Sequence, residues 1–322
     1  MPGIVRGAAA GGGRRRARRD RGEVGVVIVF GSINLDLIFP LDRLPGPGET
    51  LLGPTARVEP GGKGANQAAA AARDGARVLM AGAVGRDALA EGALAGLVAA
   101  GVDLRRVARV DAATGCAAVC TDAQGRNQIA VGAGANLLAR ADQVEDAVLD
   151  AGATLLVQME TDPAETAALI RRARTRGARV VLNLAPARPL DADALRAVDL
   201  LVVNESEADW LAGRFGAEAT AAGLRAAVGV GVVRTLGAEG AEYAADGEGR
   251  VPAHRVQVVD STAAGDCFTG VMAAALDRGA PLRDALLRAS VAAGLCCTRA
   301  GSQGSVPDTA ETDAALTRTG LL

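Results

Sequence analysis

Short apolar runs alternate with amphipathic segments along most of the chain, and each run has the length of one buried strand. Residues 25–31 form the first, an unbroken apolar stretch typical of a strand buried on both faces. We expect further strands at 77–83, 153–159, 178–183, 199–203 and 230–235, and helices at 65–73, 87–100, 163–176, 191–197, 205–213, 217–228, 267–277 and 281–299. This alternation predicts an α/β fold, with helices on both faces of a mostly parallel central sheet.

Two stretches depart from this alternation. Residues 41–58 are rich in proline and glycine and carry only short extended pieces. Residues 117–121 and 127–131 flank a polar turn, which predicts a hairpin. We therefore expect about 33–58 and 115–131 to form together a small β-sheet outside the central one.

The composition limits the core and the partners. Of 322 residues, 49% are hydrophobic but only 2% are aromatic, so alanine, valine and leucine must fill the core. No apolar run approaches the ~18 residues that span a bilayer, so we expect a soluble cytoplasmic protein without a membrane partner. Residues 1–21 hold seven arginines and one aspartate. One basic cluster without aromatic residues is a weak nucleic-acid signal, so we expect no nucleic-acid partner. Residues 1–23 are interpreted as a disordered extension, or as the product of a start codon assigned too early, ahead of one domain at 24–322.

Cysteine, histidine and lysine usage narrows the chemistry. The five cysteines form no C-x-x-C pair and His254 is the only histidine. Reduced thiols are therefore expected, while a zinc centre and a Ser-His-Asp triad are disfavoured. Any general base should be a carboxylate. Lys63 is the only lysine among 35 basic residues and stands between glycines, as expected where a compact ammonium is needed.

The strongest chemical signal lies at 260–266, where an extended apolar segment turns into a predicted helix. Small residues let backbone N–H groups approach a bound group, and the first turn of a helix leaves such groups unpaired. Asp266 adds a carboxylate to that first turn. An aspartate there often only caps its helix, but a cap does not require Ala263, Ala264 and Gly265 before it. We interpret this turn as an anion site beside a base.

Polar clusters follow several other predicted strands or open helices. They are Asn34 with Asp36, the stretch 61–66, Asn204 with Glu207, and the stretch 235–240. Ligands of open α/β sheets bind at the carboxyl ends of the strands, where these clusters are expected to meet. Neither a P-loop spacing nor a G-x-G-x-x-G fingerprint is present, which disfavours a nicotinamide-dependent dehydrogenase. The remaining set suits phosphoryl transfer to a sugar alcohol.

Seven motifs in order resemble those of the ribokinase/PfkB family of carbohydrate kinases. They are GSINLD, GGKGANQ, NLAPAR, VNESEAD, RTLGAEG, DSTAAGDCFTG and TRAGSQGSVP, and the match covers about residues 25–308. The resemblance implies a ribokinase-like three-layer sandwich with a small β-sheet lid. It also implies ATP-dependent phosphorylation of D-ribose at O5, giving D-ribose 5-phosphate and ADP.

The resemblance also implies roles for individual residues. Those expected to hold the sugar are Asn34, Asp36, Gly62, Lys63, Asn66 and Glu160. Asp266 would be the base for the 5-hydroxyl, and Ala263, Ala264 and Gly265 would form the anion hole. The ATP and Mg²⁺ side would be lined by Asn204, Glu207, Thr235 and Gly237, with Gly265 shared. Taken alone, Asp36 would be interpreted as a turn residue and Glu160 as an acid that precedes a helix.

The resemblance also implies two metal ions and a second copy of the chain as a partner. Mg²⁺ accompanies ATP, and an activating K⁺ would be bound by Asp260, Thr262, Cys296, Arg299, Gly301 and Ser305, several through backbone oxygens. The lid would close over the sugar and serve as a homodimer interface. Ser290 stands where relatives often place a group near the adenine, so that contact is open.

Two alternatives to a ribose kinase stay open. One is a sister kinase that acts on another sugar or on a nucleoside. The other is a catalytically silent sugar- or nucleotide-binding regulator, which the retained Asp266 disfavours.

Overall fold

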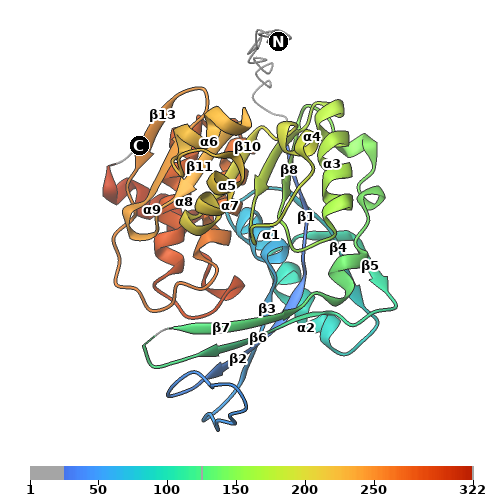
Figure 1. The fold of residues 1–322 in the computed structure, drawn as a ribbon, viewed down its shortest axis with the longest axis vertical. Helices are drawn as coiled ribbons and strands as arrows, with labels where there is room; N and C mark the ends of the chain where they lie inside the picture. The colour runs from blue at the N-terminus through green and yellow to red at the C-terminus, as the bar shows by residue number, and fades with distance from the viewer. Residues whose placement is uncertain (1–24, 125, 321–322) are drawn as a thin grey trace, which may run out of the picture.

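The computed structural model describes residues 25–124 and 126–320, which form a nine-stranded central sheet and a separate four-stranded sheet. The central sheet has the order β13-β12-β11-β10-β9-β8-β1-β4-β5 (Figure 1). Its strands are β1 (Val26–Phe30), β4 (Val78–Gly85), β5 (Asp103–Val110), β8 (Ala153–Val157), β9 (Arg179–Asn183), β10 (Leu200–Val203), β11 (Gly231–Thr235), β12 (Ala241–Ala244) and β13 (Glu248–Val251). Only the β11–β12 and β12–β13 pairs are antiparallel. The expected mostly parallel sheet is confirmed.

Helices cover both faces of this sheet, because successive strand residues point to opposite sides. Val27 and Val29 pack on one side with α1 (Lys63–Arg73), α2 (Leu89–Ala99), α7 (Ala264–Asp277) and α8 (Leu282–Cys296). Ile28 and Phe30 pack on the other with α3 (Pro163–Arg176), α4 (Ala192–Arg196), α5 (Glu205–Phe215) and α6 (Ala221–Val228). The last helix, α9 (Thr309–Thr319), packs on α8. This is the expected three-layer sandwich.

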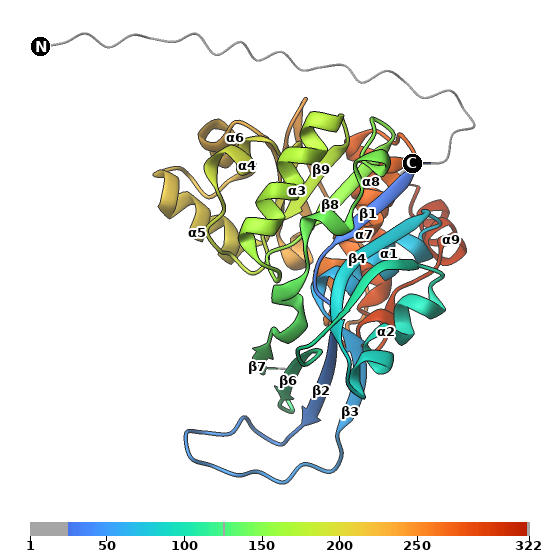
Figure 2. The ribbon, with the colours of Figure 1, turned by 90° about the vertical axis from the view of Figure 1, so that its right-hand side faces the viewer.

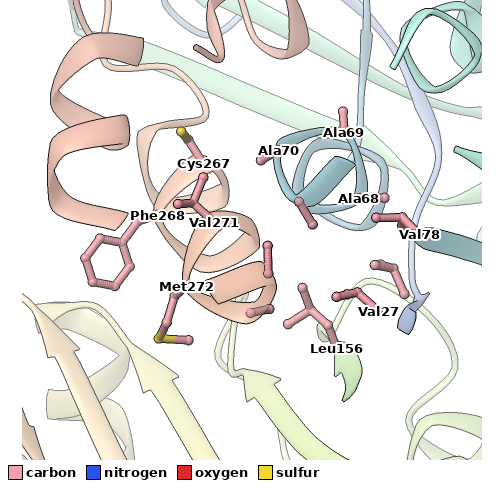
Figure 3. Packing of buried hydrophobic residues seen from close by; sticks show 14 of the residues in the cluster. Val27, Ala68, Ala69, Ala70, Val78, Leu156, Cys267, Phe268, Val271 and Met272 are labelled. Atoms are coloured by element: carbon pink, nitrogen blue, oxygen red, sulfur yellow. The ribbon is translucent and has the colours of Figure 1, made fainter. Parts of the chain in front are cut away.

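The first layer depends on small side chains where α1 meets α7 (Figure 3). Ala70 of α1 lies against Gly270 of α7. A methyl group at Gly270 would come within 2.4 Å of the Gln67 carbonyl oxygen, so only glycine lets the two helices approach this closely. Because the chain has few aromatic residues, this alanine-rich contact replaces the larger side chains of an ordinary core.

The small sheet extends from one end of the sandwich (Figures 1 and 2). Its order is β3-β2-β6-β7, formed by β2 (Asn34–Pro40), β3 (Arg57–Gly61), β6 (Gly115–Thr121) and β7 (Asn127–Gly132). The connection from β2 to β3 reaches far from the body in Figure 2. The expected small sheet is therefore confirmed.

Several elements differ from their expected extents. Strand β5, the β12–β13 hairpin and three short 3-10 helices between 134 and 148 were not expected. The polar and small residues in β5 and β13 give weak apolar patterns, because both strands lie at the sheet's edges. Helix α6 begins at Ala221, where Thr220 caps it, and not at 217. The apolar segment 256–259 joins no strand.

The basic extension expected at 1–23 lies outside the described residues. Within the described residues, no helix is both long and apolar enough to cross a bilayer.

Candidate active site

Two adjoining clefts contain many of the sequence-predicted site residues. One, of about 580 Å³, is lined by all six residues expected to hold the sugar and by Asp266. The other, of about 630 Å³ and largely apolar, is lined by Thr235, Gly237 and Gly265. Val258 and Ser261 line both clefts, so the turn that precedes α7 separates them.

Asp266 lies at this boundary, in the first turn of α7, and its side chain is nearly buried. Its two carboxylate oxygens accept hydrogen bonds from consecutive residues of α1. Asn66 Nδ2 donates to Oδ2 over 3.0 Å, and Gln67 Nε2 donates to Oδ1 over 2.9 Å. Two amide donors therefore hold the carboxylate at the edge of the 580 Å³ cleft, which we call the sugar cleft after the residues expected to hold a sugar.

The backbone before Asp266 is unusual. Ala263 has φ 58, the only positive φ at a non-glycine residue among those described. An alanine in this region costs about 1 kcal/mol, and such strain clusters at functional turns. Helix α7 has no side-chain cap; the Ala264 N–H donates to Ser261 O over 3.2 Å. The N–H groups of Gly265 and Asp266 have no partner inside the helix, so positive charge is concentrated there.

Two polar side chains that line the sugar cleft, Glu160 and Asn34, are held by hydrogen bonds from neighbouring segments. Glu160 Oε2 accepts from Ser32 Oγ at 2.5 Å and from the Lys63 N–H at 3.1 Å. Asn34 Oδ1 accepts from Asn136 Nδ2 at 2.7 Å. These contacts fix both side chains before a ligand binds.

Asp36 differs because its Oδ1 is buried without a hydrogen-bond partner in the described structure. Burial raises the pKa of Asp36 from 3.8 to about 7, and the nearby carboxylates of Glu160, Glu59 and Asp266 add to the shift. Gly61 makes this position possible, because a β-carbon there would lie 2.0 Å from Asp36 Oδ2. Asp36 also lines the sugar cleft, where sugar hydroxyls can donate to its carboxylate.

The glycines of the GGKG stretch let the start of α1 come close to the turn after β1. Gly62 has φ 87, and a β-carbon at Gly64 would lie 2.6 Å from the Ser32 nitrogen. The α1 start therefore lies directly on the turn after β1. The negative charge of Asp266 raises the pKa of Lys63, against the opposing effect of burial, and Glu160 and Glu207 act in the same direction. Lys63 therefore adds a positive charge to this acidic cleft, which Arg57 also lines.

On the other side of the boundary, Asn204 and Glu207 form a capping box at the start of α5. The Asn204 N–H donates to Glu207 Oε2 at 2.8 Å, and the Glu207 N–H donates to Asn204 Oδ1 at 2.9 Å. Burial raises the pKa of Glu207. Neither residue lines the two clefts, although the charges of Lys63 and Asp266 act on Glu207. Ser290 does line the apolar cleft, but its hydroxyl donates to Pro252 O at 2.6 Å.

Five of the six residues predicted to bind a monovalent cation lie on two neighbouring loop segments, 260–262 and 299–305, which Asp260 joins; the sixth, Cys296, is the last residue of α8. Asp260 Oδ1 accepts from the Thr262 N–H at 2.8 Å and its Oδ2 from the Gly301 N–H at 3.1 Å. Burial opposes ionisation, but these hydrogen bonds outweigh it and lower the pKa of Asp260. The Arg299 guanidinium pairs with Glu311, which leaves its backbone carbonyl as the available group. Ser305 Oγ lies 3.0 Å from Cys296 Sγ.

This arrangement fits an oxygen-ligated cation better than a transition metal. No group of three or more His, Cys, Asp or Glu side chains suited to a metal ion is found in residues 25–124 and 126–320. An alkali cation binds through carbonyl and hydroxyl oxygens, which these loops supply.

Sequence reasoning missed the residues that support the site. They are Ser32, Gln67, Asn136, Gln158, Asn183 and Gln303, all buried and hydrogen-bonded to one another or to predicted site residues. Four of them stand inside motifs singled out from the sequence: Ser32 in GSINLD, Gln67 in GGKGANQ, Asn183 in NLAPAR and Gln303 in TRAGSQGSVP. Their presence in these motifs was the available signal.

Comparison with known proteins shows which family the sequence and the fold resemble. The model of the pfkB family of carbohydrate kinases matches residues 26–309. A ribokinase of Haemophilus influenzae is 34% identical over 296 residues, covering 88% of this chain and 96% of the relative. A deoxyribokinase of Salmonella typhi is 33% identical over 291 residues, covering 87% and 95%. The structure of Arabidopsis thaliana ribokinase complexed with ribose and ATP superimposes with a TM-score of 0.81 at 29% identity, covering 91% and 99%.

Proposed function

The chain belongs to the pfkB family of carbohydrate kinases, and we propose that it transfers the γ-phosphoryl group of ATP to O5 of D-ribose. The products are D-ribose 5-phosphate and ADP. One observation carries the proposal: the carboxylate of Asp266 stands at the boundary between a polar cleft and an apolar cleft, beside the unpaired N–H groups that start α7.

The chemistry follows from that placement. D-ribose occupies the polar cleft, with its hydroxyls on Asp36, Asn34, Lys63, Asn66 and Glu160 and against the backbone of Gly62. The 5-hydroxyl gives its proton to Asp266 while O5 forms a bond to the γ-phosphorus. The bond from that phosphorus to the β,γ-bridging oxygen breaks, and its electron pair leaves with ADP.

Charge on the migrating group is balanced by the start of α7. The N–H groups at Gly265 and Asp266 point where negative charge accumulates, and Ala263 and Ala264 shape the turn. ATP lies in the apolar cleft along Thr235 and Gly237. Asn204 and Glu207 line neither cleft, and we assign them to the phosphate side because the charges of Lys63 and Asp266 act on Glu207.

We propose two metal ions for this site. Mg²⁺ neutralises charge on the phosphates of ATP, and the buried carboxylate of Glu207 is an oxygen group of the kind it prefers, acting largely through water. K⁺ is assigned to Asp260, Thr262, Cys296, Arg299, Gly301 and Ser305. The ionised Asp260, which ties both loops together, supports that assignment.

The small sheet is proposed as a lid and as a dimer interface. Ala117, Val119 and Ile129 line the sugar cleft opposite Asp266, so closure excludes water that otherwise accepts the phosphoryl group. Strand β7 is an edge of this sheet and exposes Ile129 and Val131. An exposed apolar edge favours pairing with a second copy. Sedimentation should therefore give the mass of a dimer, and a monomer at micromolar concentration contradicts this proposal.

We further propose that the enzyme works in the cytoplasm. The five cysteines are all free, as expected in a reducing compartment.

A sister activity within the family is the second candidate, favoured by the 33% identity to a deoxyribokinase. The test is a panel of D-ribose, 2-deoxy-D-ribose, other sugars and nucleosides, assayed by ADP release in K⁺ and in Na⁺. We expect ribose to have the highest kcat/KM, by ~10-fold or more over 2-deoxyribose, and activity to be higher in K⁺.

A nucleoside with the highest kcat/KM overturns the ribose assignment. Equal rates in both salts contradict the cation loop. No ADP release with any acceptor favours a non-catalytic binding protein.

A further inference from the structure

A chain of buried side-chain amides runs behind Asp266, away from the sugar. Gln158 Nε2 donates to Gln67 Oε1 at 2.7 Å, and Gln67 Nε2 donates to both Asp266 Oδ1 and Asn183 Oδ1 at 2.9 Å. Asn183 Nδ2 donates to Val202 O at 3.3 Å. Gln67 and Gln158 are completely buried, and none of the three amides lines either cleft.

These contacts allow the Gln67 amide one orientation. Its oxygen accepts a hydrogen bond from the Gln158 N–H, so its nitrogen must face Asn183 and Asp266. The Asn183 oxygen is an acceptor because its nitrogen is used by the carbonyl of Val202. Reversing Gln67 would set an amide oxygen against the carboxylate and leave Gln158 facing an N–H group, which costs several buried hydrogen bonds.

The close contact between α1 and α7 also fixes the distance between the Gln67 amide and the Asp266 carboxylate. Gly270, one turn after Asp266, touches the backbone carbonyl of Gln67 itself. The close approach of α1 and α7 therefore holds the donor and the acceptor of this hydrogen bond in register.

We propose that Gln67 is a positioning residue that sets the orientation of the Asp266 carboxylate, with Gln158 and Asn183 holding Gln67 in place. Asn66 holds the other oxygen but also faces the sugar, whereas Gln67 acts only through Asp266. The proposal rests on the proposed function, since it assigns Asp266 as the base.

The test separates a positioning role from a structural one by comparing kcat with KM. Gln67→Met keeps the size of the side chain and removes the donor. We expect kcat to fall ~10- to 100-fold, with KM for ribose and for ATP within about twofold of wild type, because a misaligned base acts mainly in the transition state. A kcat within twofold of wild type overturns the proposal, as does a loss confined to KM.

Gln143→Met is the matched control. Gln143 is a half-buried amide that also donates, to the carbonyls of Gly82 and Arg106, and it lines neither cleft. Its variant should lose thermal stability while kcat stays unchanged. An equal loss of kcat in both variants assigns Gln67 a structural role only.

Gln67→Glu covers the case in which the methionine variant does not fold. Its carboxyl donates to Asp266 only while protonated and repels it when ionised. We expect the ratio of wild-type to variant kcat to grow as pH rises from 6 to 9. The groups whose charges interact with Asp266 (Asp36, Lys63, Glu207 and Cys296) are present in both proteins, so their titration largely cancels in the ratio. A ratio near one at every pH overturns the proposal.

Failure of the proposed function gives a different result. If Asp266→Asn keeps wild-type turnover, or if wild type phosphorylates no sugar, the base assignment fails before Gln67 is tested.

Discussion

Gln303 donates its side-chain N–H to Asn66 Oδ1 over 3.1 Å, and this contact joins the 300–305 loop to the residue that holds Asp266. Without this hydrogen bond, Asn66 Oδ1 loses the donor that keeps it turned away from Asp266, so the Asn66 nitrogen is no longer held toward the carboxylate. For Gln303→Leu we expect kcat to fall ~3- to 10-fold and KM for ribose to rise, because Asn66 is proposed to bind the sugar. Steady-state kinetics in K⁺ check this. Kinetics equal to those of wild type contradict it.

Asp266→Asn should lower kcat by at least ~10², because it removes the base and keeps its shape. KM values and the melting temperature should change little. Single-turnover measurement of ADP formation, with scanning calorimetry on the same samples, tests both parts. Near-normal turnover refutes the role of Asp266.

Sugar affinity should depend on the ionisation of Asp36, whose pKa lies at about 7. Only the ionised carboxylate accepts hydrogen bonds at both oxygens, so ribose should bind more weakly as pH falls through about 7. Isothermal titration with ribose between pH 5.5 and 8.5 measures this. Asp36→Asn should bind weakly at every pH, and an affinity of wild type that is flat across this range contradicts the assignment.

The raised pKa of Asp36 also predicts how the stability of the fold depends on pH. Its pKa in the folded chain lies above the ordinary value of 3.8. The folded chain therefore holds the extra proton between these values, and the free energy of unfolding falls as pH rises from about 4 to about 7. Asp36→Asn removes this penalty and should be more stable than wild type at pH 8, by up to a few kcal/mol. Urea denaturation at pH 4 and pH 8 tests the sign, since the gain should be smaller at pH 4.

Gly61→Ala should selectively weaken the sugar site. The added methyl group would occupy the space of the Asp36 carboxylate, which lies 2.0 Å from the ideal β-carbon position. We expect KM for ribose to rise ~10-fold or more, while KM for ATP stays near that of wild type. Gly247→Ala, at a glycine with open space around it, is the control and should leave both constants unchanged.

Much of the fold could be predicted because local chemistry agrees with it. Helix α3 spans the expected 163–176, since Asp162 caps it, Pro163 opens it and Gly177 ends it in a left-handed conformation. The edge strands could not be predicted in this way. Half of the residues of β5 are charged, which breaks any apolar pattern, and the β12–β13 hairpin is held by pairing with β11 and not by an apolar pattern of its own.

The residues that line the candidate site could be predicted from the sequence, but the buried residues that hold them in place could not. The predicted sugar residues do line one cleft with Asp266. Gln67 and Asp266 are 199 positions apart in the sequence. The sequence alone does not distinguish a glutamine that orients a carboxylate from a glutamine on the surface. The distinction depends on burial, which only the packing of α1 on α7 provides. Similarly, the unpaired oxygen of Asp36 arises from the way β2 pairs with β3 at Gly61.

The wall shared by the two clefts has a consequence for redesign. Substitutions at Val258 or Ser261 should alter the proposed donor and acceptor clefts together, because both residues line both clefts. Ala117, Val119 and Ile129 of the small sheet line only the sugar cleft. Substitutions at these three positions should therefore change the preference among acceptors without changing the proposed nucleotide cleft.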